Sequence, residues 1–330
     1  MVESGEGREK KLLHMCQVTI TIGYAPHRVE VLGQMAREME GHDLIILEEP
    51  PDPWFKEMLA GKMTADAYVD ELVPAFPEFT RNACPLLQRL YRAGRLLIQV
   101  EPYLETMERI YDLLDNQGVP AARVRAMPGV VGAVYLAESR TTKALFNFYG
   151  KMGGHDFHAA VTACREFARA DAARLRLRAR LRAEAIAARV HAGDYRGRIY
   201  VEAGYLHLAL FVFLRQELKE KGIQVRPRFL LAEPLAHLAG PRAPRQLLAP
   251  GDVLTLRAVF HAPTSRKRAE LLAAQAIIYS ALLGKREKVP SARVPYPHLA
   301  EELRLLSYVR NLDYEACEAS FHKYLRKYSL

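Results

Sequence analysis

The sequence predicts an α/β protein, in which a mixed β-sheet has helices on both faces and a helical extension follows at the C-terminus. The first observation behind this prediction is an alternation of short apolar runs with longer runs whose apolar residues recur every three or four positions, which is typical of strands interleaved with helices. The second is the composition: the 330 residues are 50% hydrophobic and 26% charged, as in ordinary globular proteins. This composition excludes a disordered, fibrous or disulfide-stapled chain.

Three strands are predicted in the N-terminal part of the chain, each a short apolar run that stops at a glycine, an acidic residue or a proline. They span residues 16–22, 43–47 and 96–100. Helices are predicted after the first and the third of these strands, over residues 29–40 and 104–114, because apolar residues recur there at helical spacing. The order strand, helix, strand indicates crossover units of a sheet.

The middle of the chain repeats this design around one long helix. Residues 130–136 are predicted to form a strand, and the glycines within 150–154 a loop. Residues 157–190 are rich in alanine, leucine and arginine, which are good helix formers, and the helix is expected to stop at Gly193. Two further strands and the helix between them follow; they are predicted over residues 198–201, 225–231 and 206–221, respectively.

The proline-rich stretch 234–250 is the predicted domain boundary. The expected organisation is a flexible N-terminus (1–15), an α/β core domain that carries the site (16–234) and a mainly helical C-terminal extension (235–330). Helices are predicted there over 264–283 and 298–328. Tyrosines at helical spacing in the second of these helices favour core packing or a homodimer contact.

The chain reads as a cytoplasmic protein. It has four cysteines without Cys-x-x-Cys spacing, so neither a zinc knuckle nor a disulfide framework is predicted. The first residues are charged and lack the apolar stretch of a signal peptide, and no apolar run is long enough to span a membrane.

Polar side chains follow the predicted strands at their carboxyl ends, where α/β proteins bind ligands. His27 follows the first strand, Glu48 and Glu49 the second, Glu101 the third, and His207 the strand at 198–201. Imidazoles and carboxylates at one edge suit a divalent metal such as Zn, Mn, Fe or Co. The alternatives are surface or capping histidines and glutamates that cap helices or pair with arginine. Strand alternation lets only one of Glu48 and Glu49 point to a given face.

Two segments carry a resemblance to a known superfamily. The run RAEAIA (182–187), followed by a strand and GYLH (204–207), resembles the pattern Arg-Asp-x-x-Met-Ala, strand, Gly-x-x-His. That pattern occurs in the superfamily of the TraB and pheromone-shutdown proteins, the Tiki proteases, the erythromycin esterases and the ChaN haem-binding proteins. A histidine after the first strand, a glutamate after the second and Glu101 after the third agree in order. The first motif here is Gly-x-x-x-His, and Ala183 stands where an Asp or Asn is usual.

The resemblance covers residues 16–231 and implies a functional site. In Tiki-like members such residues bind a divalent metal, and in esterase-like members a histidine acts as general base. The expected function is a metal-dependent hydrolase of peptide or ester bonds, acting on a small-molecule or peptide substrate; the alternative is a non-catalytic protein that binds haem or another small ligand. The expected metal ligands are His27, His207 and Glu48, the expected catalytic residues Glu48, Glu49 and Glu101, and the expected substrate contacts Arg182, Tyr24 and Tyr205.

The net charge of +9 is concentrated in residues 165–198, which hold ten arginines and four acidic residues and so contribute +6. A solvated helix face is the first interpretation. The second alternative function is a nucleic-acid-binding protein that uses this arginine-rich helix. A third interpretation is that Arg182 faces the strand ends and holds a carboxylate or phosphate there.

Overall fold

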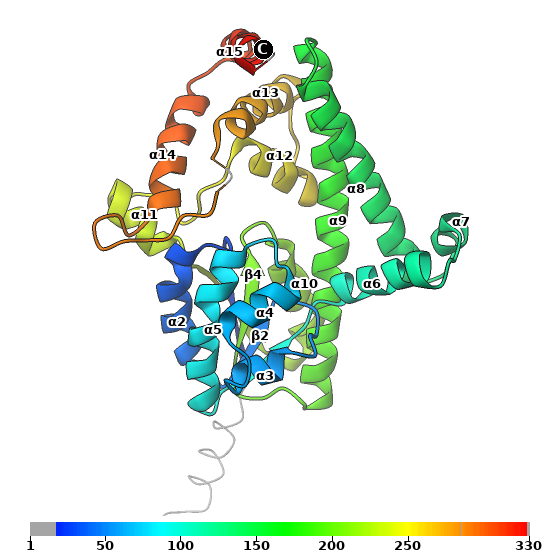
Figure 1. Ribbon diagram of the computed structural model, residues 1–330, viewed down its shortest axis with the longest axis vertical. Helices are drawn as coiled ribbons and strands as arrows, with labels where there is room; N and C mark the ends of the chain where they lie inside the picture. Colours follow the sequence, from blue (N-terminus) through cyan, green and yellow to red (C-terminus); the bar gives the residue numbers. More distant parts are fainter. Residues whose placement is uncertain (1–17, 285, 329–330) are drawn as a thin grey trace, which may run out of the picture. The chain divides into compact units, whose positions relative to one another are not determined.

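The computed structural model describes residues 18–284 and 286–328 (Figure 1). They divide into two compact units. The sheet unit takes the described chain up to Leu104 together with Ala179–Pro234 and Glu287–Pro295, and the helical unit takes Glu105–Arg178, Leu235–Arg286 and the chain from Tyr296. The predicted boundary at 234 coincides with the end of one segment of the sheet unit, but residues 105–178 group with the C-terminal helices. The predicted flexible residues 1–15 lie outside the described residues.

The sheet unit is built on five strands: β1 (Thr19–Ala25), β2 (Leu44–Leu47), β3 (Leu96–Gln99), β4 (Arg198–Gly204) and β5 (Gln224–Phe229). Their order is β3-β2-β4-β1-β5, and every neighbouring pair is parallel. The α/β prediction is therefore confirmed, but the predicted mixed sheet is wrong. Each of the first four strands is followed by helical segments that return the chain to the same end of the sheet, and such crossovers produce parallel neighbours.

The strands lie close to where the apolar runs predict them, apart from residues 16 and 17, which lie outside the described range. Two strands run longer than predicted: β1 and β4 each continue three residues past their predicted ends at 22 and 201, and they pair with each other as far as Ala25 and Gly204. Within this pair the ring of Tyr200 lies over Gly23, where a Cβ atom would overlap it. A glycine in β1 therefore lets Tyr200 pack flat against the sheet.

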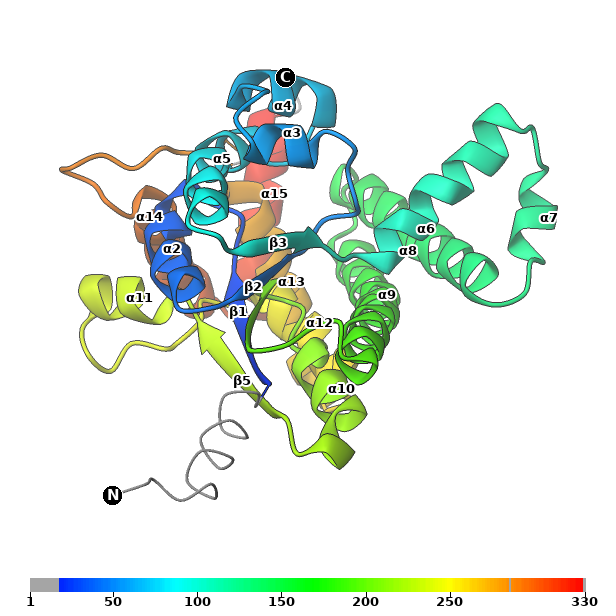
Figure 2. The same cartoon turned by 90° about the horizontal axis from the view of Figure 1, so that it is seen from below.

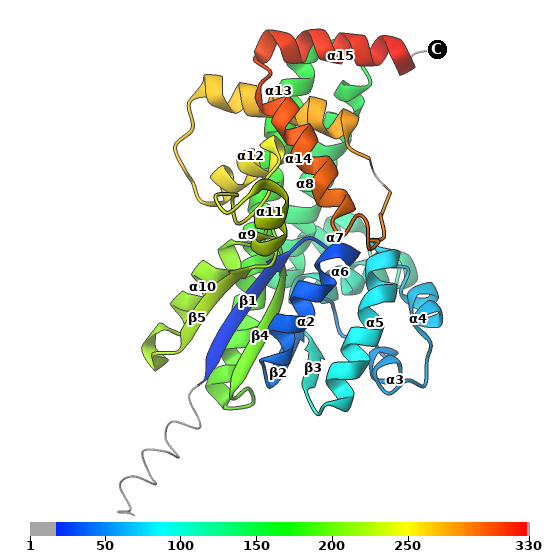
Figure 3. The same cartoon turned by 90° about the vertical axis from the view of Figure 1, so that its left-hand side faces the viewer.

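Helices cover both faces of the sheet, as predicted (Figures 2 and 3). One face carries η1 (Val29–Val31), α2 (Leu32–Glu40), α3 (Phe55–Leu59), α4 (Ala65–Leu72) and α5 (Pro77–Arg92). The other face carries α10 (Ala209–Glu217), with η3 (Lys219–Lys221) after it, and the part of α9 (Phe157–Ala192) that belongs to the sheet unit. The prediction of a long helix ending at Gly193 is confirmed, whereas α3 to α5 were not anticipated.

The connections of β1 and β4 leave the sheet toward opposite faces, although the two strands are neighbours. The chain passes from β1 into α2 and from β4 into α10, which lie on opposite sides (Figure 3). Such a point of reversal opens a crevice outside the carboxyl ends of the strands, where α/β proteins bind ligands. His27 follows β1 and His207 follows β4, so both histidines lie beside it.

The helical unit holds the remaining helices of the described chain. They are α6 (Pro102–Tyr111, from Glu105 on), the π-helical turn η2 (Asp112–Asn116), α7 (Ala121–Arg125), α8 (Val130–Met152), the first part of α9, α11 (Ala232–Ala239, from Leu235 on), α12 (Pro250–Val259), α13 (Arg266–Leu282), α14 (Pro297–Arg310) and α15 (Tyr314–Tyr328). The predicted helix at 264–283 is confirmed, and the one at 298–328 is two helices. No helix in the described ranges is long and apolar enough to cross a bilayer.

The predicted strand over 130–136 is wrong, because these residues begin α8. Val134, Thr141 and Phe148 are buried at intervals of seven, which is two turns of a helix. The short β-branched run at the start of α8 misled the prediction, and the longer period decides the structure. Gly150 also lies inside α8, so the predicted loop starts only at Gly153.

Candidate functional site

The side chains at the carboxyl ends of the strands separate onto two sides of the sheet. Successive residues of an extended chain point to opposite faces, so Glu48 and Glu49 diverge after β2. Glu48 contacts Arg182 of α9, whereas Glu49 lines a cavity beside α2 and α5. We name the two groups the α9 side and the α5 side. The α9 side holds Glu48, Glu101, Arg182 and His207; the α5 side holds His27, Glu49 and Glu202.

Arg182 is the buried centre of the α9 side, with 1% of its surface exposed. Its Nε donates a hydrogen bond to the Val100 carbonyl at 2.9 Å and lies 3.9 Å from Glu101 Oε2. Its Nη1 lies 3.7 Å from Glu48 Oε1. The two Nη groups have no hydrogen-bond partner in the described part of the chain. Arg182 thus places one positive charge between two buried carboxylates, and its Nη groups can donate further hydrogen bonds.

Glu48 links this arginine to His207. Its Oε2 accepts a hydrogen bond from the backbone N–H of Gly204, and its Oε1 lies 3.3 Å from His207 Nε2. A Cβ atom at position 204 would come within 3.1 Å of His207 Cδ2 and 3.3 Å of Glu48 Oε2. A glycine at the end of β4 therefore allows the histidine and the carboxylate to approach each other. The His207 side chain is 12% exposed, so the imidazole lies at the edge of the buried cluster.

On the α5 side, His27 faces Glu202. His27 Nε2 lies 3.8 Å from Glu202 Oε1, and the imidazole packs on Phe76 and Phe79 with ring centroids 5.6 and 5.1 Å apart. The other oxygen of Glu202 accepts a hydrogen bond from the Glu48 backbone N–H at 3.2 Å. This bond connects the two sides through the backbone of β2 and β4.

Glu49 and Glu202 are neighbouring carboxyl groups in a poorly solvated place. Burial raises the pKa of Glu49 to about 7, and the nearby charge of Glu202 adds to the effect. Burial likewise raises the pKa of Glu202 to about 7, with a further contribution from the charge of Glu48. Gln99 donates a hydrogen bond to Glu49 Oε2 at 3.1 Å, which opposes the rise. Carboxyl groups that titrate near neutrality mark candidate functional sites.

The predicted metal ligands are not gathered into one set. His27 pairs with Glu202 on the α5 side, and His207 pairs with Glu48 on the α9 side. Across residues 18–284 and 286–328, no group of three histidine, cysteine, aspartate or glutamate side chains is arranged to hold a metal ion. Arg182 already places a positive charge beside Glu48, which opposes a divalent cation there. The residues present therefore do not fit the expected metal centre.

The other predicted site residues have different surroundings. Glu101 is fully buried beside Arg182. Tyr24 is buried in the core with its ring stacked on Phe229, 5.7 Å between centroids. Tyr205 lies in the turn after β4 and is partly exposed.

Sequence reasoning missed Glu202, because the predicted strand ended at Val201 and placed Glu202 in a loop. The alternation of Tyr200, Glu202 and Gly204 along a longer strand would have assigned it to the α5 side.

The arginine-rich helix makes internal contacts instead of presenting an open basic face. Arg174 pairs with Asp171 at 2.6 Å, and Arg165 lies 3.4 Å from Glu270. Arg176 donates to the Val259 carbonyl at 2.6 Å, and the guanidinium of Arg180 stacks over the ring of Phe213. Arg165, Arg174 and Arg182 thus lie beside carboxylates, whereas Arg169, Arg180 and Arg189 are exposed, so the use of this helix in nucleic-acid binding stays a prediction.

The chain is similar over nearly its whole length to an archaeal protein. A protein of Archaeoglobus fulgidus, described as an uncharacterized protein, is 32% identical over 301 residues, which cover 91% of this chain and 97% of the relative. No family model matches the chain. No solved structure gives a significant match.

Proposed function

The chain belongs to the same family as this Archaeoglobus fulgidus protein, and we propose that it is a hydrolase in which His207, held by Glu48, acts as general base on water. The observation that carries the proposal is the 3.3 Å approach of His207 Nε2 to a carboxylate that is 2% exposed. A buried carboxylate fixes the orientation of an imidazole and stabilises the positive charge that forms when the imidazole takes a proton.

Arg182 supports this role by keeping Glu48 negatively charged. Its guanidinium lies between Glu48 and Glu101, so two carboxylates share one compensating cation. The resulting cluster has a net negative charge, which favours the protonated form of His207 after water has given up its proton. The Nη groups of Arg182, which have no hydrogen-bond partner in the described chain, are suited to hydrogen-bond water or an anionic oxygen nearby.

The reaction follows from these positions. A substrate carbonyl in the crevice beside β1 and β4 is attacked by a water molecule whose proton passes to the His207 imidazole. Glu48 holds the resulting imidazolium, which then returns the proton to the leaving alcohol or amine. This scheme corresponds to the histidine general base that the esterase-like resemblance implies, and it needs no ligand beyond substrate and water.

Hydrolysis of a panel of p-nitrophenyl esters and peptide anilides by purified protein tests the proposal. In the His207→Gln variant we expect kcat/KM to fall by about 10² to 10⁴, the range typical of a lost general base. Glu48→Gln should give a smaller loss and shift the acidic limb of the pH profile. His191→Gln, at an exposed position near the end of α9, is the matched control and should retain wild-type activity.

Two results would contradict the proposal: no hydrolysis of any substrate in the panel, or equal rates in wild type and His207→Gln. The assay is also run with a chelator and with added Zn²⁺ or Mn²⁺. A rate that appears only with metal would favour the metal-dependent hydrolase expected from the resemblance over a metal-free general base.

A further inference from the structure

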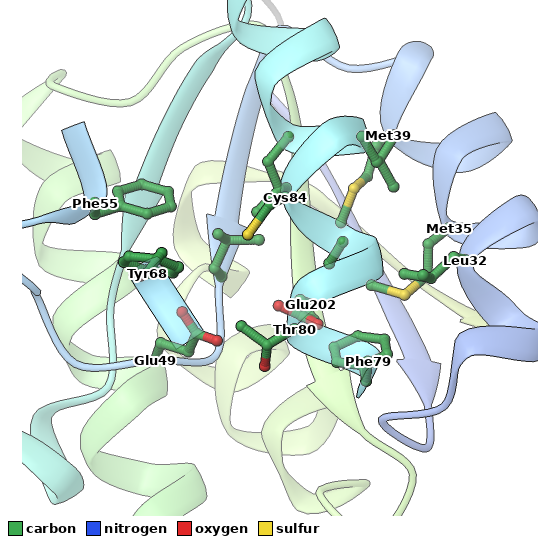
Figure 4. Close-up of a pocket in the computed structure, with 14 residues that line it drawn as sticks. Leu32, Met35, Met39, Glu49, Phe55, Tyr68, Phe79, Thr80, Cys84 and Glu202 are labelled. Carbon is green, nitrogen blue, oxygen red and sulfur yellow. The ribbon is translucent and has the colours of Figure 1, made fainter. Parts of the chain in front are cut away.

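A small cavity lies on the α5 side, separate from Arg182 and His207. Its volume is about 30 Å³ (Figure 4). Its walls come from β2, β4, α2, α3, α4 and α5, and most of them are apolar side chains such as Leu32, Met35 and Leu87. A single water molecule needs about 10 to 15 Å³ measured in this way. The cavity therefore has room for a group of about two heavy atoms.

The polar groups of this cavity are an unusual set for so apolar a place. Glu49 and Glu202 both line it, and Thr80 lies beside them in the wall (Figure 4). The Thr80 hydroxyl donates to the Phe76 carbonyl, so its oxygen can still accept a hydrogen bond. In their ionised forms the two carboxyl groups place negative charge against walls that are mostly apolar and cannot solvate it.

Tyr68 gives an independent indication that a polar ligand fits the cavity. Its side chain lines the cavity and is 2% exposed; the Gln99 amide lies near enough to act on the Tyr68 hydroxyl, but no group of the described residues meets hydrogen-bond geometry with it. A buried hydroxyl without a partner is costly, and native proteins normally satisfy it with protein, water or ligand. The rings of Phe55, Tyr68 and Phe79 in the same wall can also stabilise a cation through their faces.

We propose that this cavity binds a small primary ammonium ion of the size of methylammonium. The ammonium group donates hydrogen bonds to Glu49 and Glu202 and to an uncharged oxygen of Tyr68 or Thr80, and the methyl group packs against the methionine and leucine side chains. A cation with three donors matches two carboxylates and a hydroxyl acceptor, whereas a neutral molecule of the same size brings no positive charge to them. The methionines can adjust to a longer alkyl chain. Binding here does not depend on hydrolysis at His207.

Titration with ¹³C-methylammonium chloride at pH 8, followed by NMR of the labelled methyl group, tests this site in the full-length protein. We expect a dissociation constant in the millimolar range, as for very small ligands. The surrounding aromatic rings should shift the methyl resonance. Methanol, the neutral molecule of the same size, and sodium chloride at equal ionic strength should produce no shift.

The variants distinguish this site from general attraction of cations. Glu49→Gln and Glu202→Gln should each weaken binding by about tenfold or more, because each removes a charged hydrogen-bond acceptor. Tyr68→Phe should weaken it less. Glu57→Gln removes one exposed acidic charge from α3 and should leave binding unchanged. Thermal unfolding without ligand checks that each variant is folded.

Wild-type binding that is absent, equal to that of methanol, or unaffected in both Glu49→Gln and Glu202→Gln would overturn the inference. If methylammonium does not bind to the wild-type protein, Glu49 and Glu202 share a proton and the cavity holds water. None of these outcomes bears on the esterase assay, so failure of this site and failure of the proposed function remain separate results.

Discussion

Replacing Arg182 by methionine removes a cation that the structure places between Glu48 and Glu101, while keeping a long unbranched side chain in the core. Arg182 Nη1 lies 3.7 Å from Glu48 Oε1, and its Nε lies 3.9 Å from Glu101 Oε2. At an effective dielectric constant of about 20, each of these separations corresponds to an attraction of about 4 kcal/mol. The variant therefore takes from two buried carboxylates the positive charge that Arg182 supplies.

The protein can reduce this penalty by taking up protons. His207 can become charged and compensate Glu48, so Glu101 is the group that must be neutralised. Protonating a carboxyl group of ordinary pKa, about 4.3, costs about 4 kcal/mol at pH 7 and about 1 kcal/mol at pH 5. We therefore expect Arg182→Met to lower the free energy of unfolding by about 4 kcal/mol at pH 7, within the range for breaking a buried ion pair. The loss should shrink toward about 1 kcal/mol at pH 5.

Urea unfolding followed by tryptophan fluorescence measures this loss directly. The chain has a single tryptophan, Trp54, and it belongs to the sheet unit, so its emission reports on the unit that contains Arg182. The control is Arg189→Met on the same helix, where the arginine side chain is 65% exposed and pairs with Asp194 at 3.0 Å. An exposed pair of this kind contributes less than about 1 kcal/mol.

The reasoning is refuted if Arg182→Met loses no more stability at pH 7 than Arg189→Met does. It is also refuted if the loss is the same at pH 5 and pH 7, because the pH dependence follows directly from the unpaired carboxyl groups. A normal unfolding midpoint in Arg182→Lys would show that charge, and not the shape of the guanidinium, is what the cluster requires.

Two further predictions concern the α5 side and the sheet. Because the pKa values of Glu49 and Glu202 are raised to about 7 in the folded protein, wild-type stability should fall as pH rises from about 4.5 to 7. Each group accounts for about 3 kcal/mol at most, and Glu49→Gln or Glu202→Gln should flatten this dependence in urea unfolding at pH 5 and pH 8. Gly23→Ala should lower the unfolding free energy by about 1 to 3 kcal/mol because the added methyl group overlaps Tyr200. The control is Gly33→Ala in α2, where the added methyl group meets open space and should not destabilise the protein. Equal melting temperatures of the two variants would contradict this prediction.

The sequence predicted the strands of the sheet well because buried parallel strands are continuous apolar runs, and such runs need no knowledge of their neighbours. It did not predict the relative direction of neighbouring strands correctly. A mixed and a parallel sheet have the same local pattern, and only the pairing of β1 with β4 and β5 decides between them. The helices α3 to α5 were missed because residues 51–95 contain several prolines and glycines that interrupt their periodicity.

The candidate site was predicted in its residues more fully than in its geometry. Strand ends located His27, Glu48, Glu49, Glu101 and His207 at one edge of the sheet, and the structure places all of them there. Which of them touch depends on the face to which each side chain points. The sequence analysis stated this limit for Glu48 and Glu49 but did not apply it to the two histidines.

The α9 side and the α5 side explain why we propose two different roles for the acidic and imidazole side chains at the carboxyl ends of the strands. On the α9 side a guanidinium compensates the carboxylates, so Glu48 can orient His207 as a base. On the α5 side no arginine is paired with Glu49 or Glu202 among the described contacts, and apolar walls raise the pKa of both carboxyl groups. The hydrogen bond from the Glu48 backbone to Glu202 joins the two sides, so a cation bound between Glu49 and Glu202 lies only one residue away from the base-orienting carboxylate. Occupancy of the cavity should therefore lower the pKa of His207, because a positive charge on the α5 side opposes a second one on the α9 side.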